Sequence, residues 1–136
     1  MSHHKQILKY GASGAQAGAG HIPSTSLAST ATALTTDCWV KADFAATYLL
    51  LCETTTHAGD TTTFKFYCAT DKDGAGAALI AAAPTSVHTA VGHTVIAMPG
   101  SMVTTAAPFI CGYAVSDTST NVIKAIMIGL DPKFSP

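Results

Sequence analysis

The feature that most constrains the fold is a strict two-residue alternation in residues 61–69. One set of alternate positions holds polar or amphipathic side chains (Thr63, Lys65, Tyr67) and the other holds apolar ones (Phe64, Phe66, Cys68). Successive side chains of a β-strand point to opposite faces of a sheet, so this pattern indicates a strand with one buried face. Sequences rich in turn-forming residues lie on both sides of it, at 57–60 and 71–76.

The remainder of the chain after residue 35 contains further short segments rich in Thr, Val and Ile, separated by turn sequences. We expect strands at residues 38–41, 47–52, 87–98, 109–115 and 121–130, with 77–83 compatible with a strand or one helical turn. The unbroken apolar run in 47–52 predicts burial on both faces, and the nearly apolar 122–128 predicts a central or interfacial strand. Crossover helices, which a parallel sheet needs, are not evident. The predicted fold is an all-β, antiparallel β-sandwich, jelly-roll or immunoglobulin-like, spanning residues 36–136.

Residues 1–35 differ in composition from the rest and are expected to form a flexible or extended N-terminal arm. Glycines at 11, 14, 18 and 20 carry a large entropy cost in any regular element. Ile7, Leu8 and Tyr10 form a short apolar cluster ahead of this glycine-rich stretch. The cluster is either a loose chain end, the commoner outcome for a terminus, or a segment that docks on another surface.

The chain carries unusually few charges. Charged residues make up 11% of its 136 residues, against about 25% in a typical soluble domain, while the hydrophobic class reaches 48%. A net charge of −1 with this apolar content excludes disorder over the whole chain. Such a protein either stays soluble through its Thr, Ser and Gly residues or covers its surface in an assembly.

The distribution of apolar and basic residues argues against membrane and nucleic-acid partners. No apolar run approaches the roughly 18 residues of a membrane span, and the N-terminus lacks the apolar core of a signal peptide. We therefore expect a soluble product made in a cytoplasm. The basic residues are seven scattered lysines, with no arginine for bidentate recognition of phosphate or guanine.

The four cysteines, at positions 38, 52, 68 and 111, contain no closely spaced pair of the kind that a zinc ribbon needs. Each lies in an apolar stretch, where cysteine behaves as a small buried hydrophobe. Four reduced structural cysteines are the favoured interpretation, with one or two disulfides as the alternative.

No motif indicates catalysis, a metal or a cofactor. Asp71-x-Asp73-Gly74 resembles the start of a calcium loop, but the only glutamate, Glu53, lies upstream, so a turn with side-chain caps is favoured. His88 and His93, five residues apart, would point to opposite faces of one strand and would not share a metal unless Gly92 introduces a bulge. No nucleophile lies in a Gly-x-Ser-x-Gly context. We expect a protein that is not an enzyme.

From about residue 40 onward the chain resembles the small β-sandwich structural proteins of tailed phages, the capsid decoration or cement class. The resemblance rests on residues 47–51, on 61–66 leading into 69–74, and on the end of the chain. There an apolar strand precedes Pro132-Lys133-Phe134-Ser135-Pro136, a Pro-basic-aromatic-x-Pro tail in which arginine is the more usual basic residue.

The resemblance implies a non-enzymatic virion protein that binds and stabilises a capsid. Its partners would be the major capsid protein or other virion subunits, and it would be a homo-oligomer, most simply a trimer, made in the host cytoplasm. Ile7, Leu8 and Tyr10 in the arm and Pro132 and Phe134 at the other end are the expected assembly contacts. The alternatives are a tail, collar or head-fibre component, a carbohydrate- or receptor-binding sandwich, and a small hydrolase.

Overall fold

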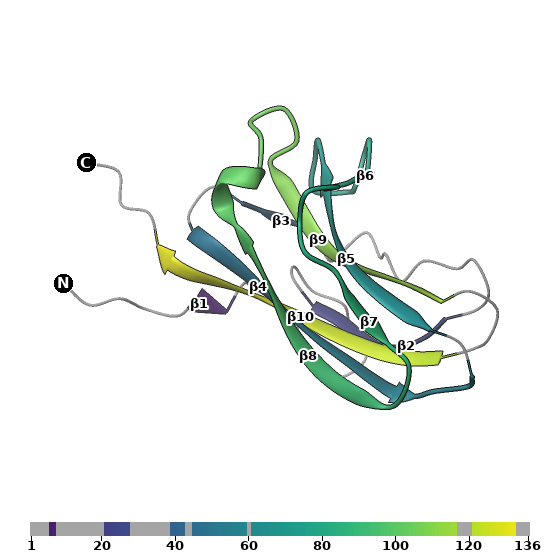
Figure 1. The fold of residues 1–136 in the computed structure, drawn as a ribbon. Coiled ribbons are helices and arrows are strands. Elements are labelled where there is room, and N and C mark those ends of the chain that lie inside the picture. Colours follow the sequence, from purple (N-terminus) through teal and green to yellow (C-terminus); the bar gives the residue numbers. More distant parts are fainter. Residues whose placement is uncertain are drawn as a thin grey trace.

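The fold is described from a computed structural model, which covers residues 6–7, 21–27, 39–42, 45–59, 61–116 and 121–132. Ten strands and one short 3-10 turn lie within these ranges, and all strand pairs are antiparallel. The strands form two sheets that face each other, which confirms the all-β, sandwich-like fold (Figure 1).

The first sheet, sheet A, has the order β1-β10-β4-β8, with β2 also paired to β10. Its members are β1 (Gln6–Ile7), β2 (His21–Leu27), β4 (Ala45–Thr56), β8 (Gly92–Pro99) and β10 (Asn121–Pro132). Strand β10, nearly apolar in sequence, lies between β4 and the two N-terminal strands. The prediction of a central strand at 122–128 is therefore confirmed.

The second sheet, sheet B, has the order β3-β9-β5-β6, with β7 also paired to β5. Its members are β3 (Val40–Lys41), β5 (Thr62–Ala69), β6 (Ala78–Leu79), β7 (Ser86–His88) and β9 (Phe109–Ser116). The 3-10 turn at Gly100–Met102 follows β8. Residues 77–83, left open between strand and helical turn, form the two-residue β6 followed by a turn.

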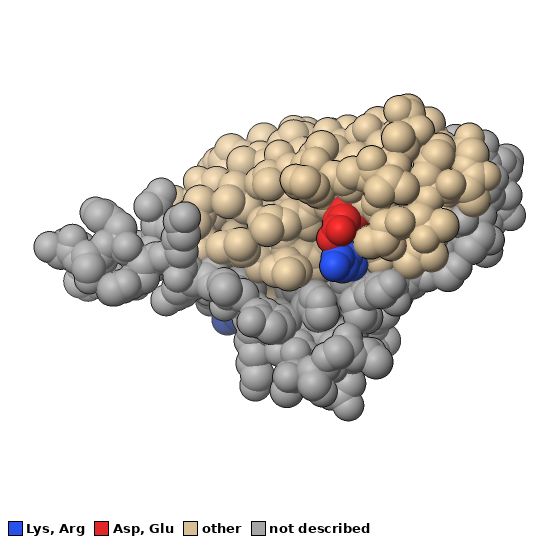
Figure 2. Space-filling model, turned by 90° about the horizontal axis from the view of Figure 1, so that it is seen from below, with Lys and Arg blue, Asp and Glu red and all other residues tan. Residues whose placement is uncertain are grey.

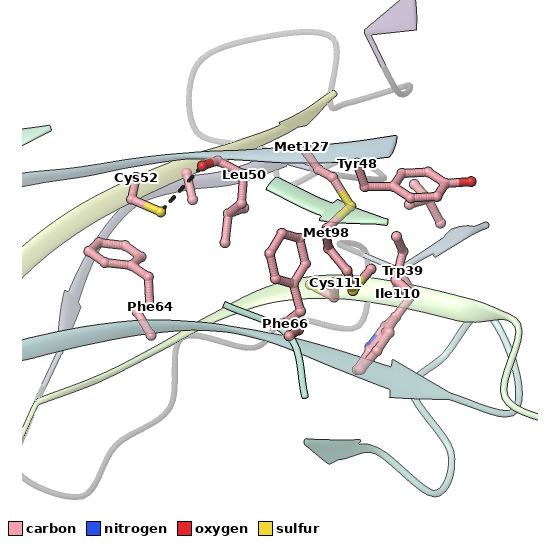
Figure 3. Close-up of a cluster of buried hydrophobic side chains, with 14 of the residues drawn as sticks. Trp39, Tyr48, Leu50, Cys52, Phe64, Phe66, Met98, Ile110, Cys111 and Met127 are labelled. Atoms are coloured by element: carbon pink, nitrogen blue, oxygen red, sulfur yellow. Dashed lines mark hydrogen bonds between the residues drawn. The ribbon is translucent and has the colours of Figure 1, made fainter. Parts of the chain in front are cut away.

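The core lies between the sheets and is filled by alternate side chains of the long strands. Cys52 and Leu50 of β4 face Phe64 and Phe66 of β5, and Tyr48, Met98 and Met127 belong to the same buried cluster (Figure 3). The alternation predicted for residues 61–69 is confirmed for the two phenylalanines, which are fully buried.

Gly112 on β9 packs closely against Leu50 on β4, in the other sheet. A Cβ built on this glycine would lie 2.6 Å from Cδ1 of Leu50, which is itself buried. Glycine is thus the residue that lets β9 approach β4 here, because any side chain would displace Leu50.

Two predicted strands differ from what the structure shows. Residues 87–98 form two strands in opposite sheets, because the chain crosses from β7 in sheet B to β8 in sheet A through residues 89–91. The run 47–52 is not buried on both faces: Tyr48, Leu50 and Cys52 are buried, but Leu49 and Leu51 on the other face are only half-buried. Strand β3 begins at Val40, and residue 38 lies outside the described ranges.

Two described segments of the predicted N-terminal arm are strands of sheet A. β1 pairs with Ile128 and Gly129, and β2 pairs with β10 from residue 121 to residue 126. These segments extend sheet A on the side of β10 away from β4. The other residues of the predicted arm lie outside the described ranges.

Candidate assembly surface

The outer face of sheet A carries aligned rows of side chains from its three adjacent strands β10, β4 and β8. Their register places Lys124, Glu53 and His93 in one row. The next rows are Ile126, Leu51 and Val95; then Ile128, Leu49 and Ala97; then Leu130, Thr47 and Pro99. Apart from the first row, this face contains no charged side chain. We call these four rows the outer A face.

Side chains of the outer A face are incompletely buried. The aliphatic side chains on β4 and β10 are half-buried, whereas those on β8 are exposed, Val95 by 56%. An open hollow of about 240 Å³ lies over the first two rows, bordered by Leu51, Glu53, His93, Val95, Lys124 and Ile126. The wall of the hollow is mostly apolar and contains no Trp, Tyr or Phe.

The charges beside this hollow neutralise each other. Lys124 Nζ lies 3.2 Å from Glu53 Oε2, and both side chains are about half exposed. Figure 2, which views the molecule from the side of sheet A, shows a broad tan surface on which an acidic and a basic group lie side by side. A half-exposed ion pair contributes little to stability, so its main effect is a face without net charge.

Strand β8 forms the edge of sheet A. It pairs with β4 at eight consecutive positions without a register shift, and among the described strands it pairs with no other. Its sequence, Gly92-His-Thr-Val-Ile-Ala-Met-Pro99, contains no charged residue. Even Thr94, which points inward, is exposed. The edge is therefore long, regular, uncharged and accessible.

Behind this edge, His88 of β7 connects the two sheets through a partly buried polar cluster. Its Nδ1 lies 2.8 Å from the hydroxyl of Thr54 on β4, and its Nε2 lies 2.8 Å from the hydroxyl of Thr94 on β8. Ser86 completes the cluster, 2.6 Å from Thr94. Burial, together with the nearby His93, lowers the pKa of His88, so the ring is held neutral. His88 and His93 thus lie on different strands, not on opposite faces of one strand.

This cluster has the residue types of a Ser/His site but not the arrangement of one. Ser86 contacts Thr94 rather than the imidazole, and the recorded partners of His88 include no carboxylate that would orient the ring. His88 is also buried. The arrangement is suited to connecting two sheets rather than to activating a nucleophile.

The Asp71 segment is a capped turn. One carboxylate oxygen of Asp71 accepts hydrogen bonds from the backbone N–H groups of Asp73 (2.9 Å) and Ala75 (3.0 Å). Backbone hydrogen bonds, first from Ala75 and then from Asp73, lower the pKa of this carboxyl. Within the described residues no three His, Cys, Asp or Glu side chains come together as metal ligands.

The cysteines correct one prediction. Cys52 and Cys68 carry free thiols, but Cys111 is disulfide-bonded, so the chain does not hold four reduced cysteines. Burial raises the pKa of the Cys52 thiol to about 12, against a smaller opposing effect of a hydrogen bond with Thr94. A thiol with this pKa is protonated at neutral pH and is a poor nucleophile.

The assembly contacts predicted from the sequence are only partly described. Ile7 lies on β1, opposite Ile128 of β10, and Pro132 ends β10, opposite Ala45 of β4. Leu8, Tyr10 and Phe134 lie outside the described residues. Sequence reasoning missed the outer A face, although its signal was present: the apolar runs 47–52 and 122–128 place aliphatic residues on both faces of neighbouring strands.

No protein-family model matches the chain, and no curated protein matches it. Within the described ranges, no helix has the length and apolar character needed to cross a bilayer.

Proposed function

We propose that this chain is a non-enzymatic structural subunit of a virion, which binds a capsid lattice through the outer A face and stabilises it. The observation that carries the proposal is a sheet face whose rows beyond the first are mainly aliphatic and whose two opposite charges, both in the first row, pair with each other. Removing such a face from water is favourable by about 25 cal/mol per Å² before the costs of association. The binding partner would be the major capsid protein or a neighbouring virion subunit.

The strand topology supports a jelly roll, the finer form of the predicted sandwich. Strands β2, β4, β8 and β10 lie in sheet A, while β3, β5, β7 and β9 lie in sheet B. Along these eight strands the chain changes sheet at six of the seven connections, and the sheet orders β2-β10-β4-β8 and β3-β9-β5-β7 interleave distant segments. An immunoglobulin-like sandwich instead joins several of its neighbouring strands as hairpins. Jelly rolls occur in viral capsid proteins and in lectins, so this topology is one that virion proteins use.

The alternative classes have less support from the side chains. Carbohydrate-binding sites use exposed aromatic rings, and none lines the hollow on the outer A face. Hydrolysis would need an accessible nucleophile beside an accessible base. Cys52 and His88 are both buried, and the half-buried Cys68 lies in sheet B whereas the exposed His93 lies in sheet A. A tail, collar or head-fibre role would use the same face and differs only in the partner.

The first experiment is cosedimentation of the purified chain with capsids assembled without it. Leu51→Lys and Ile126→Lys, each placing a charge within the outer A face, are expected to weaken binding at least about tenfold. The matched control is Leu79→Lys on β6, because Leu79 is an exposed aliphatic residue, 42% accessible, in sheet B. Equal binding by all three variants and the original chain would refute the assignment to the outer A face.

A second experiment addresses the termini. Ile7, Leu8 and Tyr10 remain proposed anchors at one end, and Pro132 and Phe134 at the other. A chain lacking residues 1–20 retains β2 and is expected to fold but to bind capsids less tightly. Unchanged binding by this truncated chain would remove the N-terminal contacts from the proposal.

A further inference from the structure

Strand β8 lacks the features that usually protect an exposed sheet edge. Natural edge strands are shortened, bulged, charged or covered, because an open edge is a template for another strand. β8 has eight residues in regular register, no charged side chain, and a proline only at its last position. Val95, near the centre of β8, is 56% exposed, and Val91, the residue that precedes the strand, is 63% exposed.

We propose that β8 pairs with β8 of a second copy of this chain, antiparallel across a twofold axis. The two A sheets then form one continuous sheet. A strand that pairs antiparallel with itself is self-complementary, so the second copy supplies the matching row of N–H and C=O groups. No charged side chain of β8 opposes its counterpart, and Glu53, which lies opposite His93 on β4, is neutralised by Lys124 within its own subunit.

The pleat and Pro99 determine the register of this contact. Side chains on the outer face of one copy must lie beside side chains on the outer face of the other. The twofold axis therefore passes through a position where a residue pairs with the same residue of the second copy, and not between two residues. An axis at Val95 pairs the segment 92–98 of one copy antiparallel with the same segment of the other copy. Pro99, which has no N–H to donate, then lies outside the ladder. His93 then faces Ala97 of the second copy, and the row of Ile126, Leu51 and Val95 continues into the same row of the partner.

The area of the outer A face explains why two copies would join. Three strands about 4.8 Å apart and four rows about 6.8 Å apart give a projected area of about 390 Å² per subunit. A stable interface of standard size buries about 800 Å² on each partner. One subunit therefore presents about half of that area, and an edge-paired dimer presents about 780 Å² of continuous, largely apolar surface. In this respect the inference rests on the proposed function, whereas the β8 contact itself does not.

The test uses charges of opposite sign at the twofold axis. Directly opposed Cβ atoms in such a ladder are about 5 Å apart, so Val95→Lys opposes two ammonium groups and Val95→Glu opposes two carboxylates. Size-exclusion chromatography with light scattering is expected to show a dimer for the unmodified chain. Each variant alone should dimerise more weakly by a factor on the order of 10 to 100. An equimolar mixture of the two variants should recover the dimer, which a misfolded variant could not do. Leu79→Lys is the control and should remain dimeric.

The outcomes separate this inference from the proposed function. A monomer at all accessible concentrations, a trimer, or a dimer insensitive to both Val95 substitutions would overturn the β8 contact. Capsid binding by a chain that is monomeric in solution would overturn the contact and leave the virion role intact. A β8-dependent dimer that never binds capsids would support the contact and count against the virion role.

Discussion

Replacing His88 is expected to loosen the junction between the two sheets by a predictable amount. In His88→Ala, the hydroxyl of Thr54, which is fully buried, loses its 2.8 Å partner, a cost of about 1–3 kcal/mol. Thr94 is affected less, because it keeps its 2.6 Å contact with Ser86. Loss of the ring contact with Phe64, at a centroid separation of 4.9 Å, adds about 0.5–1.5 kcal/mol. The free energy of unfolding should therefore fall by roughly 2–4 kcal/mol.

The same residue makes stability depend on pH. The pKa of His88 is lowered in the folded chain, so protonation favours the unfolded state. The contribution of the neutral His88 ring to the free energy of unfolding is fully present above the pKa of histidine in the unfolded chain, about 6.5. It is lost as the pH falls from there toward the lowered pKa of His88 in the folded chain. The slope cannot exceed about 1.4 kcal/mol per pH unit for one proton.

Urea unfolding followed by the fluorescence of Trp39, the only tryptophan and a buried one, measures both effects between pH 8 and pH 4.5. The control is His88→Gln, which retains hydrogen-bonding groups but does not titrate in this range. The free energy of unfolding of this variant should vary less with pH than that of the unmodified chain. The difference between the two profiles reports His88, because the other histidines are common to both proteins. Identical pH profiles for these two proteins, or a loss below 1 kcal/mol in His88→Ala, would refute the reasoning.

Three further predictions concern the core and the thiols. Gly112→Ala should destabilise the fold by about 1–3 kcal/mol in chemical denaturation, because the new methyl group collides with Leu50; an unchanged midpoint would show that Leu50 moves aside freely. Asn121→Ala should lower the free energy of unfolding by about 2–3 kcal/mol in the same assay, because this buried amide donates to Thr62 (2.7 Å) and accepts from the N–H of Ala58 (2.6 Å). A loss under about 1 kcal/mol would contradict a stabilising role for these two hydrogen bonds. Under native conditions at pH 7.5 an alkylating reagent should leave Cys52 unmodified and label Cys68. In denaturant without reductant both of these thiols should react and Cys111 should not; labelling of Cys111, detected by mass spectrometry, would contradict the disulfide.

The sequence predicted the fold class well because strand alternation is a local property. Residues 61–69 and 109–115 alternate or remain apolar over lengths typical of strands, and both are strands of sheet B. The break in 87–98 was missed because residues 89–91 resemble their neighbours in hydropathy. A change from one sheet to another is decided by which strands pair, which is a non-local property that hydropathy does not encode.

The assembly surface was harder to predict for a related reason. An apolar run such as 47–52 has the same sequence whether its second face is covered by a helix, by another subunit or by solvent. Only the register with β10 and β8 shows that Leu49 and Leu51 belong to aligned aliphatic rows. His88 was likewise assigned to the wrong strand, so its contacts with Thr54 and Thr94 could not be anticipated.

The two outer faces of the sandwich differ in a way that bears on the kind of partner. On sheet B, Tyr67 and Tyr113 stack on each other at 4.0 Å, Tyr113 is buried, and burial raises its pKa. The turn at Gly74 packs so closely on Trp39 that a Cβ would collide with the indole. The aromatic rings of that face are thus engaged in contacts within the chain. On sheet A the accessible side chains beyond the row of Lys124, Glu53 and His93 are mainly aliphatic, and those rows offer neither the stacking surface nor the hydrogen bonds that a sugar requires. They fit another apolar protein surface, which supports the proposed assembly role of the outer A face.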